Sequence, residues 1–525
     1  MNRTAGHKKF RPLINALTSV IGFTLLTSCQ GQPSVQFTLS FEQASRHQFH
    51  VQMHLSEWDM DSLTLKMPTW MPGFYQYMHY AAAVTDFQAY DGAKSAIQFE
   101  HPNENTWLLT GTSKKEIFLD YDVITSRRFV ANSYVDSLHA YIIPESAFLY
   151  PDGHLDLPST IKLIPQSARH LVATGLTPQN ESNSIFYAPD FDILYDSPIL
   201  VGDLQELPSF EVRGVGHRFF AYQPGDFDQE RLIDGLHKVV ESAVEIFNDI
   251  PYQEYTFLGI GPGRGGIEHL NNTSFGFSGD QLRDDAGYIR MFNFLGHEYF
   301  HHYNVKRIRP FELGPFDYDK GSKTNLLWVS EGLSVYYEYI TVRRAGLVDE
   351  ATLLNQFAGN IKGTEEDPGL PYQSLAQASY ATWQDGPFGG NNGEDDRSIS
   401  YYEKGPVVGL LLDFTIRHAT QNESSLDDVM QMLYKKYYKA QGRGFTDAEF
   451  QQTCEEIAGI PLDEFFEYIY TTKPLDYGRY LAYGGLTLIA RPRAVDPSST
   501  EYLLERIPEP DELQKKIYAD WVHHE

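Results

Sequence analysis

The spacing of hydrophobic residues divides the chain into two regions of different secondary structure. From about Val35 to Pro208, short segments such as 63–67 and 117–121 alternate hydrophobic with polar residues and are separated by Pro, Gly and Asn. This period of two predicts an antiparallel β-domain over 35–208. From residue 209 the pattern changes, and hydrophobic residues recur at helical spacing from Leu232 to Phe247. We therefore predict a second, mostly helical domain over 209–485.

Further helices are expected on the same grounds. They lie at 288–305, 325–345, 403–417, 447–457 and 510–521. Residues 363–400, rich in Gly, Asp and Pro, are the longest segment expected to be irregular and to border a cleft. Residues 486–525 are charged and contain Pro, and we predict a C-terminal tail.

The N-terminus has the features of an export signal. Basic residues precede an apolar run at 13–26 that is too short for a confident membrane span. The run ends in Leu-Thr-Ser-Cys, which resembles the lipobox of bacterial lipoproteins. We therefore predict a signal peptide over 1–28, a lipid on Cys29, and a tether over 29–34. Gln30 after this cysteine implies an outer-membrane lipoprotein facing the periplasm or the cell surface. The alternative is an ordinary cleavable signal that happens to contain a cysteine.

Composition narrows the classes of function. The 525 residues are 42% hydrophobic and 21% charged, as expected of globular domains. Subtracting 70 acidic from 42 basic residues gives a formal charge of −28, which would repel a nucleic-acid backbone, so nucleic acid is not an expected partner. The only cysteines are Cys29 and Cys454. With so few thiols, a transition metal has to be bound by His and carboxylate side chains.

The sequence His-Glu-x-x-His at 297–301 carries the main chemical signal. On a helix, the four-residue step places His297 and His301 on one face, where two imidazoles can bind one zinc ion. Glu298 is rotated away from the metal but close enough to take a proton from water at the zinc. The flanking residues are apolar, and a buried His-Glu-His set is costly without a metal or partners.

A catalytic zinc site needs a third protein ligand and an open position for water. Glu331 lies 30 residues beyond His301 in an otherwise apolar helical segment, Leu327 to Leu333. We predict that Glu331 is this ligand, in a site with one zinc ion. The alternative is a carboxylate paired with a buried cation. Asp317 and Glu338 are weaker ligand candidates, and His302 is expected to be exposed or to support the ligands.

Longer segments around this motif resemble a known family. They are Gly265 to His269, His297 to Pro310, Trp328 to Gly332, and Met67 to Tyr75. Over about residues 35–485 the chain resembles metallopeptidase family sixty-one, the glycyl aminopeptidases. The resemblance implies an N-terminal antiparallel β-domain followed by a thermolysin-like, mainly helical gluzincin catalytic domain. It also implies an aminopeptidase that prefers small N-terminal residues such as Gly or Ala in peptide substrates.

The resemblance assigns further roles. Ser400 to Gly405 is similar to the Tyr-Glu-Lys-Gly segment of related gluzincins, whose tyrosine stabilises the oxyanion. This implies that Tyr402 is a catalytic residue, with adjacent Tyr401 as the alternative. Glu268 matches the carboxylate that binds the free amino group of a substrate. Many family members carry a PDZ domain after the catalytic domain, but the residues beyond Leu486 are too few for one.

Three other interpretations need consideration. Gly261 to Gly266 satisfies the dinucleotide pattern G-x-G-x-x-G, but no helical pattern follows it. Gly265 and Gly266 are instead expected to let an edge strand approach a bound peptide. A non-catalytic peptide-binding lipoprotein would tolerate loss of the zinc and Glu298 residues, yet all are present. A zinc endopeptidase is disfavoured by Glu268. The sequence does not determine the oligomeric state.

Overall fold

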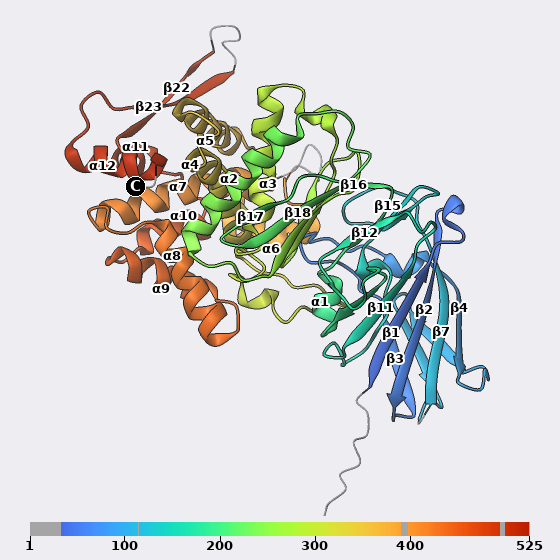
Figure 1. Cartoon of the computed structure of the whole chain (residues 1–525). Coiled ribbons are helices and arrows are strands. Elements are labelled where there is room, and N and C mark those ends of the chain that lie inside the picture. The colour runs from blue at the N-terminus through green and yellow to red at the C-terminus, as the bar shows by residue number, and fades with distance from the viewer. Residues whose placement is uncertain (1–32, 114, 390–396, 494–498, 524–525) are drawn as a thin grey trace, which may run out of the picture. The chain divides into compact units, whose positions relative to one another are not determined.

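The computed structural model describes residues 33–113, 115–389, 397–493 and 499–523. The predicted signal peptide, Cys29 and most of the tether lie outside these ranges. The residues from Pro33 onward form one compact unit, in which a strand-rich part is followed by a helical part (Figure 1). Within the described ranges, no helix combines the length and apolarity needed to cross a bilayer.

The strand-rich part contains three sheets. The largest has the order β13(Thr177–Pro178), β14(Ile185–Ala188), β11(Ser159–Ile164), β1(Ser34–Ser40), β2(Gln48–Trp58), β7(Lys115–Ile124) and β4(Val84–Asp91). The second has the order β10(Tyr150–Pro151), β3(Ser62–Lys66), β6(Thr106–Thr110) and β5(Phe99–Asn103). The third has the order β12(Leu171–Thr174), β15(Ile199–Gly202), β9(His139–Ile142) and β8(Tyr134–Val135), and the short helix α1(Phe191–Tyr195) precedes β15.

Alternation along these strands builds the first core. In β2, the residues Phe49, Val51, Met53 and Leu55 are fully buried, whereas the residues between them are half-buried. Within these three sheets, the described strand pairs are antiparallel except β1 with β11. A parallel pair needs a long connection, and β1 and β11 are joined by a long stretch of chain rather than by a hairpin. The expectation of a mainly β N-terminal region is confirmed.

A fourth sheet begins the catalytic part. Its order is β16(Leu204–Glu206), β18(Val215–Tyr222), β19(Glu254–Gly259), β21(Asn272–Phe275) and β20(Gly266–Glu268), with β17(Phe210–Val212) paired to β18. Strand β20 is the terminal strand of this order and runs antiparallel to β21. Gly261 to Gly266 leads into this strand and not into a helix, so the glycine pattern offers no helix N-terminus to a dinucleotide.

The helices pack beside this sheet. They are α2(Gln229–Phe247), α3(Asp285–Phe300), α4(Leu333–Arg344), α5(Glu350–Glu365), α6(Leu375–Asp385), α7(Tyr401–Ala419), α8(Leu426–Leu433), α9(Asp447–Ala458), α10(Asp463–Tyr470), α11(Tyr477–Tyr483) and α12(Glu512–His523). Two π-helical segments, Trp328–Gly332 and Tyr434–Lys439, precede α4 and follow α8. Helix α6 lies inside the segment 363–400, so the expectation of a wholly irregular insertion there was wrong.

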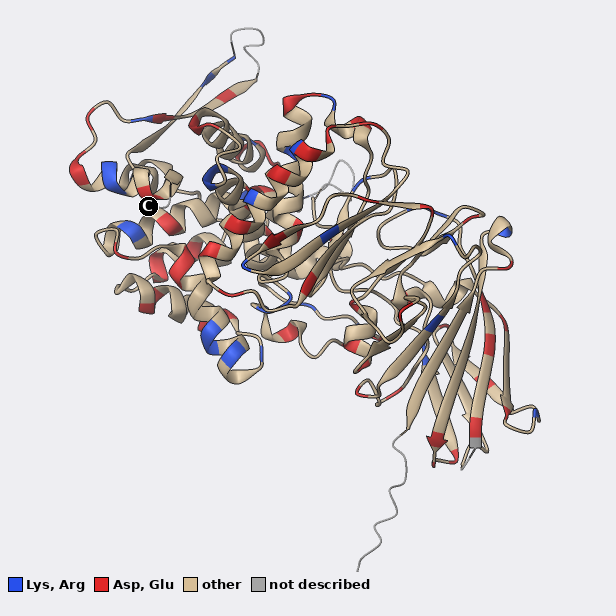
Figure 2. Cartoon of the chain, in the orientation of Figure 1, with Lys and Arg blue, Asp and Glu red and all other residues tan. Residues whose placement is uncertain are grey.

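The tail is part of the folded body. Strands β22(Leu486–Pro492) and β23(Thr500–Arg506) form a hairpin, and β23 packs against α5. Helix α12 buries Trp521 and Ile517 and packs on α4 and α7. Figure 2 shows acidic residues on both the strand-rich and the helical part, with basic residues interspersed.

Candidate active site

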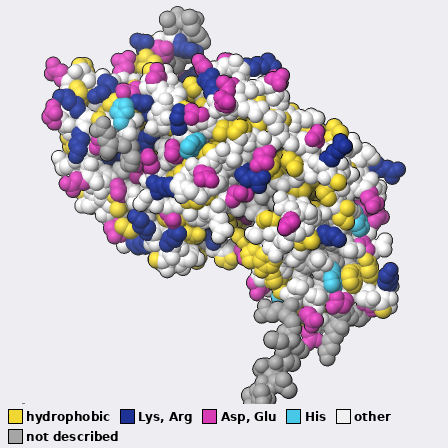
Figure 3. Space-filling view, in the orientation of Figure 1, with side chains coloured by type: hydrophobic (Ala, Val, Ile, Leu, Met, Phe, Trp, Pro, Cys, Tyr) yellow, Lys and Arg dark blue, Asp and Glu magenta, His cyan; other side chains and the backbone are white. Residues whose placement is uncertain are grey.

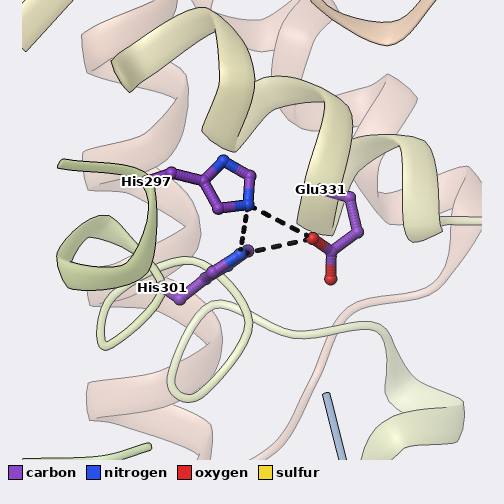
Figure 4. A group of neighbouring side chains, drawn as sticks. All are labelled: His297, His301 and Glu331. Carbon is purple, nitrogen blue, oxygen red and sulfur yellow. Dashed lines mark hydrogen bonds and ion pairs between the residues drawn. The ribbon is translucent and has the colours of Figure 1, made fainter. Parts of the chain in front are cut away.

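Three buried side chains from two helical elements meet at one point (Figure 4). His297 lies in the last turn of α3, His301 is its C-cap residue, and Glu331 lies in the π-helical segment before α4. The two Nε2 atoms are 2.9 Å apart, and Glu331 Oε2 is 3.6 Å from His297 Nε2 and 3.3 Å from His301 Nε2. Ligands of a tetrahedral zinc at 2.0–2.1 Å are roughly 3.3 Å from one another. The donor set and its spacing therefore fit a zinc ion.

The second nitrogen of each imidazole has its own partner. His301 Nδ1 lies 2.8 Å from the backbone oxygen of Asn304, and His297 Nδ1 lies 3.1 Å from Glu338 Oε2. In both rings Nε2 is the nitrogen that lies near Glu331, while Nδ1 lies near another group, and this leaves both Nε2 atoms able to bind a metal. Glu338 is thus placed behind His297 rather than among the ligands.

Asn304 ties the two ligand-bearing elements together. Its side-chain amide donates to the backbone oxygens of Val329 and Ser330, at 2.8 and 3.1 Å. These carbonyls belong to the π-helical segment, where the regular helical hydrogen bonds are interrupted. One residue therefore fixes the His301 ring through its backbone and the Glu331 backbone through its side chain. Helix α3 ends at Phe300, earlier than the predicted 305, because the chain turns here to make these contacts.

Glu298 lies under the edge strand of the sheet. It is 5% exposed, and burial raises its pKa to about 7, while His297 and His301 oppose that rise. A Cβ atom added to Gly266 would lie 2.3 Å from Glu298 Oε1. Only glycine lets strand β20 pass this close to the carboxylate.

Glu268, at the other end of β20, is also buried. It is 4% exposed, and its nearest described neighbours include Gly73 of the N-terminal part, where an added Cβ would lie 2.8 Å from Glu268 Oε2. Glu268 Oε1 and Glu298 Oε2 are both buried without a hydrogen-bond partner among the described residues. Such carboxylate oxygens are costly unless a ligand satisfies them.

Tyr402 and Tyr401 have different surroundings. The Tyr402 hydroxyl donates to Glu331 Oε2 at 2.9 Å, and its ring lies beside that of His297. The Tyr401 hydroxyl is 3.0 Å from Thr382 Oγ1 and is fully buried. Gly332 and Gly405 allow this arrangement, because a Cβ on Gly332 would lie 2.7 Å from the Cα of Gly405. The close helix crossing brings the first turn of α7 to Glu331.

The other candidates lie away from the three ligands. His302 is completely buried among Tyr252, Tyr299 and Tyr303, and burial together with Arg307 lowers its pKa well below the ordinary value. Of the two expectations for His302, exposure was wrong, because the side chain is buried; its described contacts are with these tyrosines and Arg307. The carboxylate of Asp317 accepts from the backbone nitrogens of Asp319 and Lys320. Neither belongs to the metal-binding group.

The N-terminal part reaches the site through a loop that the sequence did not single out chemically. Trp70 and Tyr75 are buried within the core of the catalytic part, and Trp70 Nε1 donates to the backbone oxygen of Asp317. Burial, then the carboxylates of Glu331 and Glu268, raise the pKa of the Tyr75 hydroxyl well above its ordinary value. Tyr75 is therefore a neutral phenol near both glutamates.

Comparisons with known proteins agree with this geometry. Residues 36–203 match the Peptidase M61 N-terminal domain, and residues 290–408 match the M61 glycyl aminopeptidase model. No curated protein matches the chain. The crystal structure of an aminopeptidase N family protein from Idiomarina loihiensis is 26% identical, with a TM-score of 0.82, over 87% of this chain and 79% of that one.

A more distant structure has the same fold. The M1 zinc metallopeptidase from Deinococcus radiodurans is 13% identical with a TM-score of 0.50, and the match covers 84% of this chain and 94% of that chain. The chain therefore belongs to the M61 family of glycyl aminopeptidases and is a zinc aminopeptidase.

Proposed function

We propose that this enzyme hydrolyses the first peptide bond of peptides that begin with a small residue, Gly or Ala. The observation that carries the proposal is the pair of buried, unpartnered carboxylates, Glu268 and Glu298, at the two ends of strand β20. One is suited to bind a free amino group, and the other is suited to accept a proton beside the three metal ligands.

His297, His301 and Glu331 would bind one zinc ion, which when bound polarises a carbonyl oxygen and lowers the pKa of water. Glu298 accepts the proton of the attacking water, and its buried carboxylate beside His297 and His301 is suited to this role. Tyr402 donates a hydrogen bond from its hydroxyl to the oxyanion that develops on the scissile carbonyl and keeps its proton. Glu298 then returns the proton to the leaving amine.

Glu268 gives the reaction its exopeptidase character. A free ammonium group satisfies the buried carboxylate, whereas an internal or acylated peptide bond would leave it unpaired, at a cost of about 1–3 kcal/mol or more. The preference for small residues is supported by crowding near this carboxylate. Gly73 approaches Glu268 and Ile267 closely, and the buried Tyr75 hydroxyl lies near enough to Glu268 for its pKa to be raised by that carboxylate. We expect little room there for a large first side chain.

The proposal is tested with free and N-acetylated Gly-Ala-Ala and with Leu-Ala-Ala. We expect release of Gly from the free tripeptide, little release of Leu, and no cleavage after acetylation. Equal cleavage of the free and acetylated peptides would identify an endopeptidase. Absence of all cleavage by protein that contains zinc would identify a peptide-binding protein.

The role of Glu298 is tested by Glu298→Gln. We expect one zinc ion per chain in the variant and a turnover reduced by about 10²–10⁴-fold. The matched control is Glu230→Gln, because Glu230 is exposed at the start of α2. A Glu298→Gln variant with full turnover would exclude Glu298 from the mechanism.

We also propose that the enzyme is held at the bacterial outer membrane by a lipid on Cys29. The support is the lipobox-like sequence before this residue. Mass spectrometry of the mature N-terminus tests it. A mature chain that begins elsewhere than at a lipidated Cys29, or a Cys29→Ala variant that stays in the membrane fraction, would contradict the proposal.

A further inference from the structure

A cavity of about 270 Å³ is lined in part by the loop that leads into strand β20. Arg127 and Arg128 from the N-terminal part line one side, and Arg264 and Ile260 from the loop before β20 line the other. The lining residues among those described include three arginines and no acidic residue. On the face drawn in Figure 3, by contrast, Lys and Arg side chains are interspersed with Asp and Glu.

Two of the three arginines lack a carboxylate partner. Arg128 pairs with Asp136 at 2.8 Å, and Arg127 lies over the ring of Phe129. No ion pair between described residues involves Arg127 or Arg264. Both are exposed, so their guanidinium groups are available to an anion that enters the cavity. Although the chain has a formal charge of −28, this cavity is a local positively charged site that can bind an anion.

The position of the cavity relative to the reaction follows from strand β20. This strand pairs only with β21 among the described strands, so its other edge can accept a peptide as an added strand. The amino group of a substrate is placed at Glu268, and its scissile bond at Glu298 beside Gly266. The peptide then continues past Gly265 toward Arg264, opposite to the direction of β20.

The spacing along the strand sets which substrate residue reaches the cavity. Arg264 precedes Gly266 by two residues, which is at most about 7 Å of chain, because Gly265 between them has a φ of 85° and is not extended. Exposure increases in the same direction, from buried Glu268 through half-buried Gly266 to exposed Arg264. Val130, at the end of the arginine-bearing segment, is 3.4 Å from the position of a Cβ on Gly265. The segment 127–130 therefore flanks the path of the leaving part of the peptide.

We propose that Arg127 and Arg264 bind a carboxylate on the second residue after the scissile bond. This inference rests on the proposed aminopeptidase function and assigns its substrate class: short peptides whose C-terminal carboxylate falls at that residue, or longer peptides with Asp or Glu there. The ligand chemistry is the same in the two cases, because a guanidinium group forms paired hydrogen bonds with either carboxylate.

The wild-type enzyme provides the first test. We expect kcat/KM for Gly-Ala-Ala to exceed that for Gly-Ala-Ala-amide by about tenfold, as for a hydrogen-bonded charge at a partly exposed site. A comparison of Gly-Ala-Glu-amide with Gly-Ala-Gln-amide tests the other source of a carboxylate, which is an acidic side chain. Turnover of all four peptides at equal rates would overturn the inference while leaving the aminopeptidase function intact. Failure to cleave any of them would reject the proposed function itself.

Variants locate the effect. In Arg127→Gln/Arg264→Gln, the ratio of kcat/KM for Gly-Ala-Ala to kcat/KM for its amide is expected to fall to about one. Because both values are measured on the same preparation, their ratio does not depend on the fraction of folded enzyme. Arg264→Glu is expected to favour Gly-Ala-Lys-amide over Gly-Ala-Glu-amide. The matched control is Arg169→Gln, an exposed arginine of the N-terminal part outside the cavity, which should keep the wild-type ratio. Persistence of the wild-type ratio in the double variant would overturn the inference.

Binding gives a readout that does not depend on turnover. With Glu298→Gln as the background, calorimetric titration should give a Kd for Gly-Ala-Ala about tenfold lower than for its amide. Adding Arg127→Gln/Arg264→Gln should make the two Kd values equal. A lower Kd for the free acid in that triple variant would contradict the assignment.

Discussion

The Tyr402 hydroxyl contacts a member of the metal-binding group, whereas the Tyr401 hydroxyl does not. Because Tyr402 donates to Glu331 at 2.9 Å while Tyr401 bonds to Thr382, Tyr402→Phe should remove an oxyanion donor without changing a metal ligand. We expect kcat to fall by about 10²–10³-fold with little change in KM. Steady-state kinetics with Gly-Ala-Ala and zinc analysis of the variant measure both.

Tyr401→Phe is the matched control at the neighbouring position. It loses a buried hydrogen bond, which costs about 1 kcal/mol of stability, and should keep most of kcat. A larger loss of kcat in Tyr401→Phe than in Tyr402→Phe would assign the oxyanion role to Tyr401.

Residues of the site differ in how far the sequence could predict them. His297 and His301 were predictable because a helix fixes the relation between residues four apart. Glu331 was predictable because a carboxylate buried in an apolar helical segment needs a metal ion or a charged partner. The roles of Asn304 and Glu338 depend on how two helices cross and on the π-helical segment before α4. No local pattern encodes those contacts, although Glu338 was already a candidate as a buried-helix carboxylate.

Helices and strands were predicted well where a single period continues. Helix α2 buries Leu232, Leu236, Val239, Val240, Ala243 and Phe247, as its spacing indicated. The prediction failed where a tertiary contact ends an element or starts one. Helix α3 ends at the turn that carries His301. Helix α6 begins at Leu375, after its N-cap residue Ser374, inside a segment that composition marked as irregular. Caps of this kind are single residues and leave no periodic signal.

Helix α7 contains a charge that lowers its stability. Lys404 is 1% exposed, and its Nζ has no hydrogen-bond partner among the described residues. Burial lowers its pKa to about 8, and Glu365 only partly opposes this. In the unfolded chain the Lys404 amine has a pKa of about 10.4, so between pH 8 and 10.4 it is protonated in the unfolded chain and largely neutral in the folded one. The free energy of unfolding therefore rises with pH across this window, and the destabilisation by Lys404 is fully present below pH 8.

Lys404→Met should therefore stabilise the enzyme at pH 7, by about 2–4 kcal/mol, since each pKa unit corresponds to about 1.4 kcal/mol. Urea unfolding at pH 7 and pH 10.5 measures the difference between variant and wild type, which should shrink at the higher pH. Lys435→Met, at an exposed lysine, should change stability little at either pH. A Lys404→Met variant less stable than wild type at pH 7 would show that Lys404 has a partner that offsets its burial.

At the scale of the whole molecule, the strand-rich part and the catalytic part are joined by a buried network of charges. Asp196, which caps α1, accepts hydrogen bonds from His269 Nδ1 at 3.3 Å and from the backbone nitrogen of Leu270 at 2.6 Å. It also forms an ion pair with Lys306, whose side chain is 6% exposed. Although burial acts to raise the pKa of Asp196, Lys306 and His269 outweigh it and hold the pKa below its ordinary value.

This network holds the two residues that directly follow Glu268. Asp196→Ala leaves Lys306 buried without its partner, which should cost about 3–5 kcal/mol of stability. It also frees the end of β20, so we expect KM for Gly-Ala-Ala to rise because Glu268, the proposed amine-binding carboxylate, is less well positioned. Calorimetry and steady-state kinetics measure these effects. Asp196→Asn keeps an acceptor for the Leu270 nitrogen and should lose stability while retaining more of the substrate affinity.

Asp156→Ala is the control for the strand-rich part, because Asp156 is exposed there, and it should match wild type in both measurements. If Asp196→Ala unfolds at the wild-type temperature with an unchanged KM, the two parts do not depend on this network. If instead its KM rises and Asp196→Asn restores it, the N-terminal part supports substrate binding through the end of β20, in addition to the contacts of Gly73 and Tyr75 near Glu268. Catalysis would then require both parts of the chain, although Glu298 and the three residues that could hold a metal come from the catalytic part alone.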